Sequence, residues 1–505
     1  MMRVINTSDI FQLLFFFFLI EAIVVLAFDM CRTVFKNQFD NIINNNTFPD
    51  YVACLVEFSK NKNFAKTSLQ SIEVLRQSIS RMADFAKSPS GLKFLQSTMD
   101  HVPVSVLPGG PIPSSEDPDY RFWFPLLFGL YEIIMTGDLE VRTRGLNYLF
   151  DTLKVYGKGF SQDFWEVISK GVLFPIFDDL KMSRSDQTKF DNREDMSVWL
   201  STTLIQALRN FIDLFSYHFQ TLSFLVDGVL DLLSVCMTQG ELFNNLYFYF
   251  FFGNILLSLV FMVILFMLKN NFIYSFKYLL ENETLARIGS TCLQQFIEGN
   301  VEKLDPVVWD KICNTFIRLF SMTTPKALFD FNNPKNSQSG AKNSMEMKNY
   351  STESLPIENE EHRSAEFPLS PTNDEPLITA SNPAEQKKAF NQITVKCVLH
   401  LLVIQTLHEV LNGPNDSVYL SLSTRHLFIL IDCLERSYRF AQAFNNDLEL
   451  RMTLHRMGFM KQLPNLLKQE TSAVSGYIAA LQRMYADSSP ERHNHRKEIE
   501  NRLIP

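Results

Sequence analysis

Two histidine pairs are the first residues of this chain whose type and spacing could support chemistry, because imidazoles bind metals and transfer protons near neutral pH. His493 and His495 lie two residues apart near the carboxyl end, and His400 and His408 share one apolar segment. The first pair lies in a charged tail, which is typical of a solvated surface. The second pair is typical of histidines on the surface or in the core of a helix. Neither pair predicts a metal site.

The seven cysteines could form disulfides or bind zinc, but their spacing favours neither. Their number is odd and none belongs to a Cys-x-x-Cys pair; they are Cys31, Cys54, Cys236, Cys292, Cys313, Cys397 and Cys433. This pattern indicates reduced thiols in the cytosol.

Common catalytic motifs are also missing. The sequence contains no GxxxxGK[ST] loop, no HExxH and no GxSxG, which are the patterns of phosphate cradles, zinc proteases and esterase nucleophiles. The net charge of −8 shows no footprint for nucleic acid. We therefore assign no catalytic, cofactor-binding or metal-binding residue, and we expect no cofactor.

Three polar motifs each allow a functional and a structural interpretation. The charges of "DLEVRTR" either recognise a partner or cap a helix and pair along its surface, and we favour the structural interpretation. Ser370-Pro371 is either a phosphorylation site or an unmodified linker serine. The glycosylation patterns have no meaning in a cytosolic chain. The residues are Asp138, Glu140, Arg142 and Arg144 for the charges, and Asn45-Asn46-Thr47 and Asn415-Asp416-Ser417 for glycosylation.

Helical periodicity dominates the segments that must position these residues. Asp305 followed by Pro306 is typical of a helix N-terminus. Weak internal similarity among "AKTSLQSI", "VRTRGLNYL" and "ARIGSTCL" favours stacked helical hairpins. We predict an all-α fold, a HEAT- or armadillo-like α-solenoid of antiparallel helix pairs. Its expected apolar stripes include Leu204, Leu208, Phe211 and Phe215 in one helix, and Trp309, Ile312, Phe316 and Phe320 in another.

Composition divides the chain into nine segments. Helical repeats are expected at 21–100, 120–239 and 281–331, and a C-terminal helical domain at 388–487. The segment 332–387 is a linker with too little apolar content to offset the entropy of ordering it, so we expect it to be disordered. The other segments are an apolar N-terminus at 1–20, a loop at 101–119, a hydrophobic insert at 240–280, this disordered linker at 332–387 and a polar tail at 488–505.

Several segments together resemble the carboxyl-terminal region of the large Golgi Arf guanine-nucleotide exchange factors, the Sec-seven/BIG class, and most closely its fungal members. The resemblance runs from residue 21 to about 485, apart from the linker and the insert. It rests on "FPDYVACLVEFSKN", "FWFPLLFGLYEIIMTGDLEVRTRGLNYLFDTLKVYG", "SVWLSTTLIQALRNFIDLF", "LARIGSTCLQQFI" and "LPNLLKQETSA".

The resemblance implies a role in Golgi vesicle traffic. Family members are cytosolic, bind peripherally to trans-Golgi membranes, and exchange GDP for GTP on Arf through a separate helical domain. That domain's signature, resembling "FRLPGEAQKIDR", is absent from these residues, so we expect no exchange by this chain alone. The downstream solenoids of the family serve membrane recruitment, autoinhibition and GTPase binding. Expected partners are therefore small GTPases of the Arf or Rab type, a membrane surface and a second copy of the chain.

The insert admits two interpretations. Its uncharged stretch 246–268 is long enough to span a bilayer, which would make the chain an integral membrane protein. However, deleting 240–280 joins "SVCMTQ" to "ENETLARIG" as continuous family-like sequence. The insert is rich in residues of A/T-rich codons, and its edges can encode intron boundaries in frame. We interpret it, and residues 1–20, as translated intron, with the true protein continuing upstream. A generic helical scaffold without a GTPase link is the third alternative.

Overall fold

The computed structural model describes residues 21–45, 47–88, 119–180, 199–238, 283–332, 383–414, 416–458 and 460–503. Within these ranges the chain is helical and forms no strand, which confirms the all-α prediction. Several predictions lie outside the described residues: the apolar N-terminus, the insert, nearly all of the loop and of the linker, Ser370-Pro371 and Asn415.

The chain divides into two compact units. The first comprises Met1–Leu319 and Glu409–Leu427, and the second comprises Phe320–His408 and Phe428–Pro505. Most elements belong to the first unit: α2 (Glu21–Asn44), α3 (Phe48–Lys60), α4 (Ala65–Lys87), η1 (Asp119–Trp123), α6 (Phe124–Thr136), α7 (Leu139–Tyr156), η2 (Gly157–Gly159), α8 (Gln162–Ile168), η3 (Ser169–Leu173), η4 (Phe174–Leu180), η6 (Leu200–Leu204), α10 (Ile205–Tyr217), α11 (Phe219–Leu222), η7 (Ser223–Leu225), α12 (Val226–Thr238), α15 (Glu283–Glu298), η10 (Val301–Lys303), most of α16 (Pro306–Thr323), and α18 (Asp416–Ser421).

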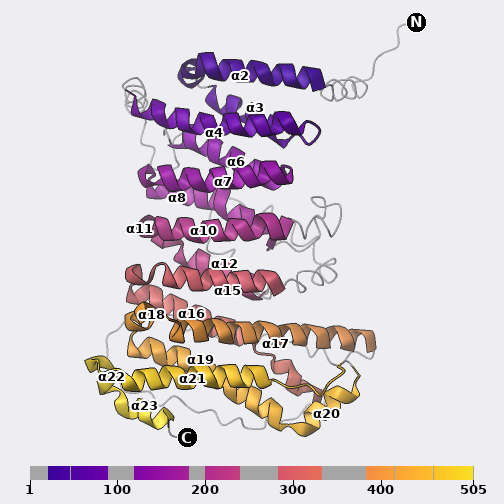
Figure 1. Ribbon diagram of the computed structural model, residues 1–505, viewed down its shortest axis with the longest axis vertical. Helices are drawn as coiled ribbons and strands as arrows, with labels where there is room; N and C mark the ends of the chain where they lie inside the picture. Colours follow the sequence, from indigo (N-terminus) through magenta and orange to yellow (C-terminus); the bar gives the residue numbers. More distant parts are fainter. Residues whose placement is uncertain are drawn as a thin grey trace, which may run out of the picture. The chain divides into compact units, whose positions relative to one another are not determined.

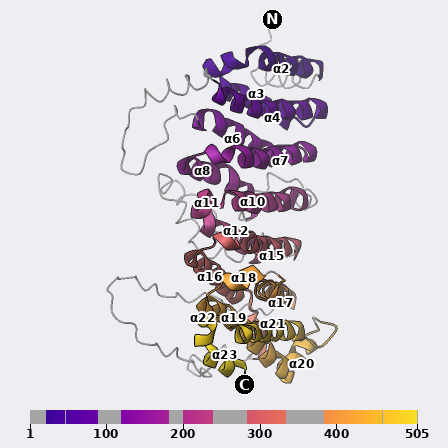
Figure 2. The same ribbon diagram turned by 60° about the vertical axis from the view of Figure 1, so that its left-hand side comes forward.

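Helices of the first unit pack in consecutive pairs, and contacts between these pairs line the helices up in rows. The pairs α3–α4, α6–α7 and α12–α15 are in contact, and contacts also join α2 to α4, α4 to α7, α7 to α10, and α10 to α15. Figures 1 and 2 show α4, α7, α10 and α15 as one row, with α3 and α6 in a second row beside it. Stacked hairpins of this kind each bury their apolar stripe against their neighbours. The HEAT- or armadillo-like classification itself stays a prediction.

Residues of the predicted stripes are buried in the first unit. Leu204, Leu208, Phe211 and Phe215 are at most 1% exposed. The N-terminus of α16 forms as expected, because the Val308 amide donates to Asp305 Oδ1 at 2.8 Å.

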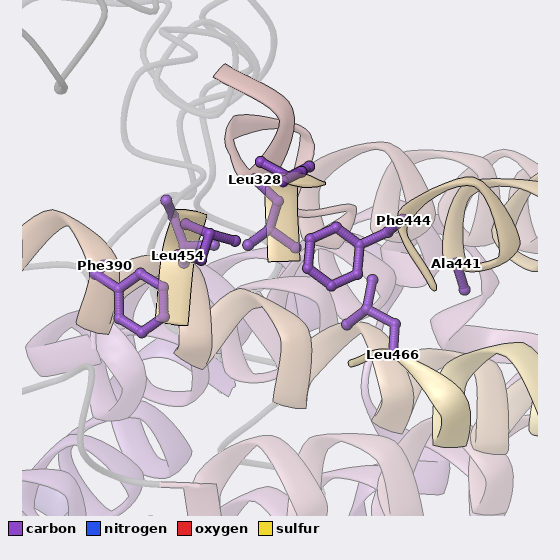
Figure 3. Close-up of a cluster of buried hydrophobic side chains, with 8 residues drawn as sticks. Leu328, Phe390, Ala441, Phe444, Leu454 and Leu466 are labelled. Atoms are coloured by element: carbon purple, nitrogen blue, oxygen red, sulfur yellow. The ribbon is translucent and has the colours of Figure 1, made fainter. Parts of the chain in front are cut away.

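The second unit contains η11 (Lys326–Asn332), most of α17 (Pro383–Asn412), most of α19 (Thr424–Asn446), α20 (Leu448–Arg456), α21 (Leu467–Ala486), α22 (Pro490–Asn494) and α23 (Arg496–Leu503). Figure 3 shows part of its core, where Phe444 and Phe390 are among the buried apolar side chains. The Phe329 ring meets Phe444 edge-on at 6.1 Å.

Two predicted boundaries differ from the structure. The helix that was expected from 388 begins at Pro383, inside the predicted linker. Residues 490–503, expected as part of a polar tail, form α22 and α23. Helix α23 packs on α21, and its Ile499 is fully buried. In addition, the Arg502 guanidinium pairs with Asp432 and lies 4.7 Å from the centre of the Phe428 ring.

Two described stretches are long and apolar enough to cross a membrane by length and composition alone, Phe219–Thr238 and Ala389–Asn412. The first is mostly buried within the fold, as expected for a core helix.

Candidate functional site

Three of the four histidines in the two pairs pack against neighbouring residues of the fold. His400 is 1% exposed; its Nδ1 lies 3.0 Å from Thr323 Oγ1, and its ring meets Phe320 edge-on at 5.7 Å. His408 packs against Gly476, where an added Cβ would lie 2.9 Å from the His408 Nδ1. His495 packs edge-on against the Phe428 ring. No cluster of three metal-ligating side chains occurs among the residues that the structure describes.

The cysteines are free thiols, and most are buried. Burial raises the pKa of Cys397 to about 12 and that of Cys292 to about 11. Thiols with such a high pKa are poor nucleophiles and poor metal ligands at neutral pH.

One serine–histidine–aspartate arrangement, which no local sequence pattern predicts, joins α16 to the start of α19. Ser423 Oγ lies 3.0 Å from His426 Nδ1, and His426 Nε2 lies 3.1 Å from Asp310 Oδ1. Such a set of side chains could in principle activate a nucleophile.

The bonds of this arrangement instead indicate a structural role. Ser423 is the N-cap of α19, because its hydroxyl oxygen accepts from the His426 amide at 3.2 Å. His426 is 4% exposed, and Arg425 pairs with the same Asp310 oxygen at 3.2 Å. The hydroxyl is therefore engaged in capping, and the histidine ring ties the cap to α16.

The "DLEVRTR" charges lie on the first turns of α7. Glu140 and Arg144 form an i, i+4 ion pair at 2.7 Å, whereas Asp138 lies at the N-cap position without a side-chain capping hydrogen bond. Arg142 is half-buried, and burial lowers its pKa. The Glu140–Arg144 pair agrees with the structural interpretation, but the capping part of that interpretation is not observed. Arg144 also lines the groove described next.

A surface groove of about 490 Å³ lies between α2, α4 and α7 in the first unit. Phe35 and Val74 form its floor and are 8% and 6% exposed. Arg81 of α4 fixes the α2 wall, since its Nη1 donates to the Phe35 carbonyl at 2.6 Å. The lining residues are Arg32, Phe35 and Lys36 from α2, Lys66, Leu69, Gln70, Glu73, Val74 and Gln77 from α4, and Arg144 from α7.

The charges of this groove, which we call the α2–α4–α7 groove, leave it basic. Its one lining carboxylate, Glu73, pairs with Arg76 at 2.6 Å, and that guanidinium lowers the pKa of Glu73. Arg32 pairs with Asp29. Lys36 and Lys66 form no ion pair with any residue that the structure describes. Two uncompensated cations therefore flank an apolar floor, in a chain whose net charge is −8.

Only Arg144 of this groove was singled out from the sequence. The other lining residues come from two helices more than twenty residues apart, and their charges are ordinary for helix surfaces. The sequence contains one local signal. Lys66 has no acidic residue three or four positions away, and Lys36 has only Asp40, four positions later.

Comparisons with known proteins show that most of this chain is similar to one group of proteins. Residues 398–505 match the family described as the BIG2 C-terminal domain. The chain is 29% identical over 91% of its length to the ADP-ribosylation factor guanine nucleotide-exchange factor SEC7 of Saccharomyces cerevisiae, of which it covers 23%. It is 29% identical over 93% of its length to sec72 of Schizosaccharomyces pombe, an exchange factor of the same description, of which it covers 22%.

A human relative extends the match. The chain is 28% identical over 96% of its length to the Brefeldin A-inhibited guanine nucleotide-exchange protein 1 of Homo sapiens, of which it covers 25%. The chain thus spans about a quarter of the length of these relatives. No solved structure matches significantly. The resemblance to the carboxyl-terminal region of the Sec-seven/BIG exchange factors is confirmed.

Proposed function

We infer, from its relationship to the Sec-seven/BIG class of Arf exchange factors, that this chain acts as the regulatory carboxyl-terminal part of such a protein in Golgi vesicle traffic. One observation carries the proposal: the match covers 91–96% of this chain but only 22–25% of three relatives, and one segment matches a domain described as carboxyl-terminal. The roles we propose are membrane recruitment, autoinhibition and GTPase binding, with location in the cytoplasm and peripherally on trans-Golgi membranes.

Helical packing supports a binding role. Stacked helices present long surfaces for protein partners. We therefore propose that the chain binds Arf- or Rab-type GTPases. We also propose that it does not itself exchange their nucleotide, because the signature expected of the exchange domain is not found in these residues.

Binding and exchange can be tested with one set of proteins. The purified chain is expected to bind a GTP-loaded Arf or Rab more tightly than the GDP-loaded form. It is expected to leave the release of a fluorescent GDP analogue from Arf unaccelerated. Equal binding to both nucleotide states of every GTPase tested would contradict the regulatory proposal, and accelerated release would contradict the absence of catalysis.

Membrane attachment separates this proposal from its alternative. The uncharged residues 246–268 favour an integral membrane protein by hydropathy. A peripheral protein is released from membranes by alkaline carbonate, whereas a spanning protein is retained. We expect release of the expressed chain; retention would favour the alternative.

A further inference from the structure

We propose that the α2–α4–α7 groove binds an acidic peptide segment of a protein partner. The segment would place an apolar side chain on the groove floor and carboxylates beside the lysines. This surface goes beyond the proposed function, because its ligand is defined by charge and shape and not by a GTPase.

Charge is the first reason. Lys36 and Lys66 are exposed and line the groove from two different helices, α2 and α4. The nearby Glu73 carboxylate is already neutralised by Arg76, and Tyr148 also donates to it at 3.0 Å. A carboxylate entering the groove therefore meets two cations without displacing an existing ion pair. Complementary charge of this kind sets specificity and the rate of association.

Shape is the second reason. The apolar floor is recessed, since Phe35 and Val74 are each less than one-tenth exposed. A planar bilayer cannot bring its acyl chains to such a floor, whereas a peptide side chain can reach into it. Gln70 is exposed, lines the groove and can donate to, or accept from, a peptide backbone.

Rigidity is the third reason. The Arg81 guanidinium lies 5.3 Å from the centre of the Phe35 ring and 4.7 Å from that of Phe39, in addition to its bond to the Phe35 carbonyl. These contacts hold the α2 wall against α4 before any ligand arrives. A wall that is already ordered lowers the entropic cost of binding.

A labelled peptide tests the groove directly. The probe is a fluorescein-labelled peptide of alternating glutamate and leucine, with two matched peptides in which lysine replaces glutamate or serine replaces leucine. Fluorescence anisotropy with the full chain should show binding of the first peptide alone, weakening as salt is raised.

Paired variants assign the site. The double variant Lys36→Glu/Lys66→Glu is expected to weaken binding at least about tenfold. The matched control Lys158→Glu/Lys468→Glu changes the net charge equally at exposed lysines elsewhere and should bind as the unchanged chain does. A third variant, Gln70→Trp, should block the groove without changing charge, and circular dichroism confirms that each variant folds.

Three outcomes would overturn the proposal. They are unchanged affinity in the Lys36/Lys66 variant, no binding of the acidic peptide at about 100 μM, and equal binding of the lysine peptide. Sedimentation with phosphatidylserine-containing vesicles that depends on Lys36 and Lys66, in the absence of peptide binding, would assign the surface to a membrane instead.

Discussion

Gly157 shows at the residue scale how closely this interior is packed. The indole of Trp165 is fully buried, and its Nε1 donates to the Gly157 carbonyl at 3.1 Å. A Cβ at position 157 would lie 2.4 Å from Trp165 Cζ2 and 3.2 Å from His218 Nε2. The absence of a side chain at position 157 is therefore what lets the ring pack against the end of α7.

Gly157→Ala should lower the free energy of unfolding by about 1–3 kcal/mol, because the added methyl group must displace a buried ring. Gly159→Ala is the matched control, since its Cβ would meet nothing within 4 Å. Urea unfolding followed by tryptophan fluorescence measures both. Equal midpoints for the two variants would contradict this account of the packing.

His400 predicts a pH dependence of stability. Burial lowers the pKa of this histidine to about 4, from an ordinary value of 6.5. Below pH 6.5 the unfolded chain binds the proton and the folded chain does not, so stability falls as the pH decreases through this window. The loss should reach up to about 3 kcal/mol near pH 4.

Comparison of variants isolates this histidine from the carboxylates that titrate in the same range. His400→Gln should show a smaller loss of stability between pH 6.5 and 4 than the unchanged chain. The control variant His455→Gln, at an exposed position, should lose as much stability over this pH range as the unchanged chain. The free energy of unfolding is measured with urea at each pH. An equal decrease in all three proteins would show that His400 does not control the pH dependence of stability.

Helix ends were predicted from sequence where the signal is local, and missed where it depends on another element. Asp305 caps α16 as expected, because the residue type and the following proline are both in the sequence. Ser423 caps α19 together with a histidine whose partner, Asp310, lies 116 residues away. No local pattern contains that partner.

Ser423→Ala should cost about 1 kcal/mol, since the α19 amide loses its acceptor and the His426 ring loses a partner. Ser423→Asp should restore most of the loss, because aspartate is an equally good N-cap. Thermal unfolding followed by circular dichroism measures both variants. Ester hydrolysis that depends on Ser423 would contradict the structural role assigned to this site.

At the scale of the whole molecule, α12 and α15 test the interpretation of the insert. The carboxyl end of α12 packs on the second turn of α15, where a Cβ at Gly289 would lie 2.9 Å from Cys236 Cβ and 3.3 Å from the Met237 nitrogen. Removing 240–280 leaves three residues between Thr238 and Glu283. Connections of this length commonly join packed helices.

Deletion of Gly240–Leu280 should therefore leave the helix content of the first unit unchanged and raise the solubility of the chain. Circular dichroism at 222 nm and sedimentation of the expressed protein measure these effects. Loss of cooperative unfolding in the deletion variant would show that the insert belongs to the fold. Sequencing the mature transcript across these codons is the independent check, and finding them retained would contradict the intron interpretation.

The sequence by itself determined the helical class, the buried stripes of α10 and α16, the absence of common catalytic motifs and the relationship to the exchange factors. These follow from periodicity, composition and collinear similarity, which are properties of the chain read in order. Tertiary structure alone decided that α23 docks on α21, that Ser423 and His426 meet Asp310, and that three helices form one basic groove. Such contacts join residues that are distant in sequence. They depend on which helices pack together, and the amphipathic pattern of a single helix carries no information about the identity of its neighbour.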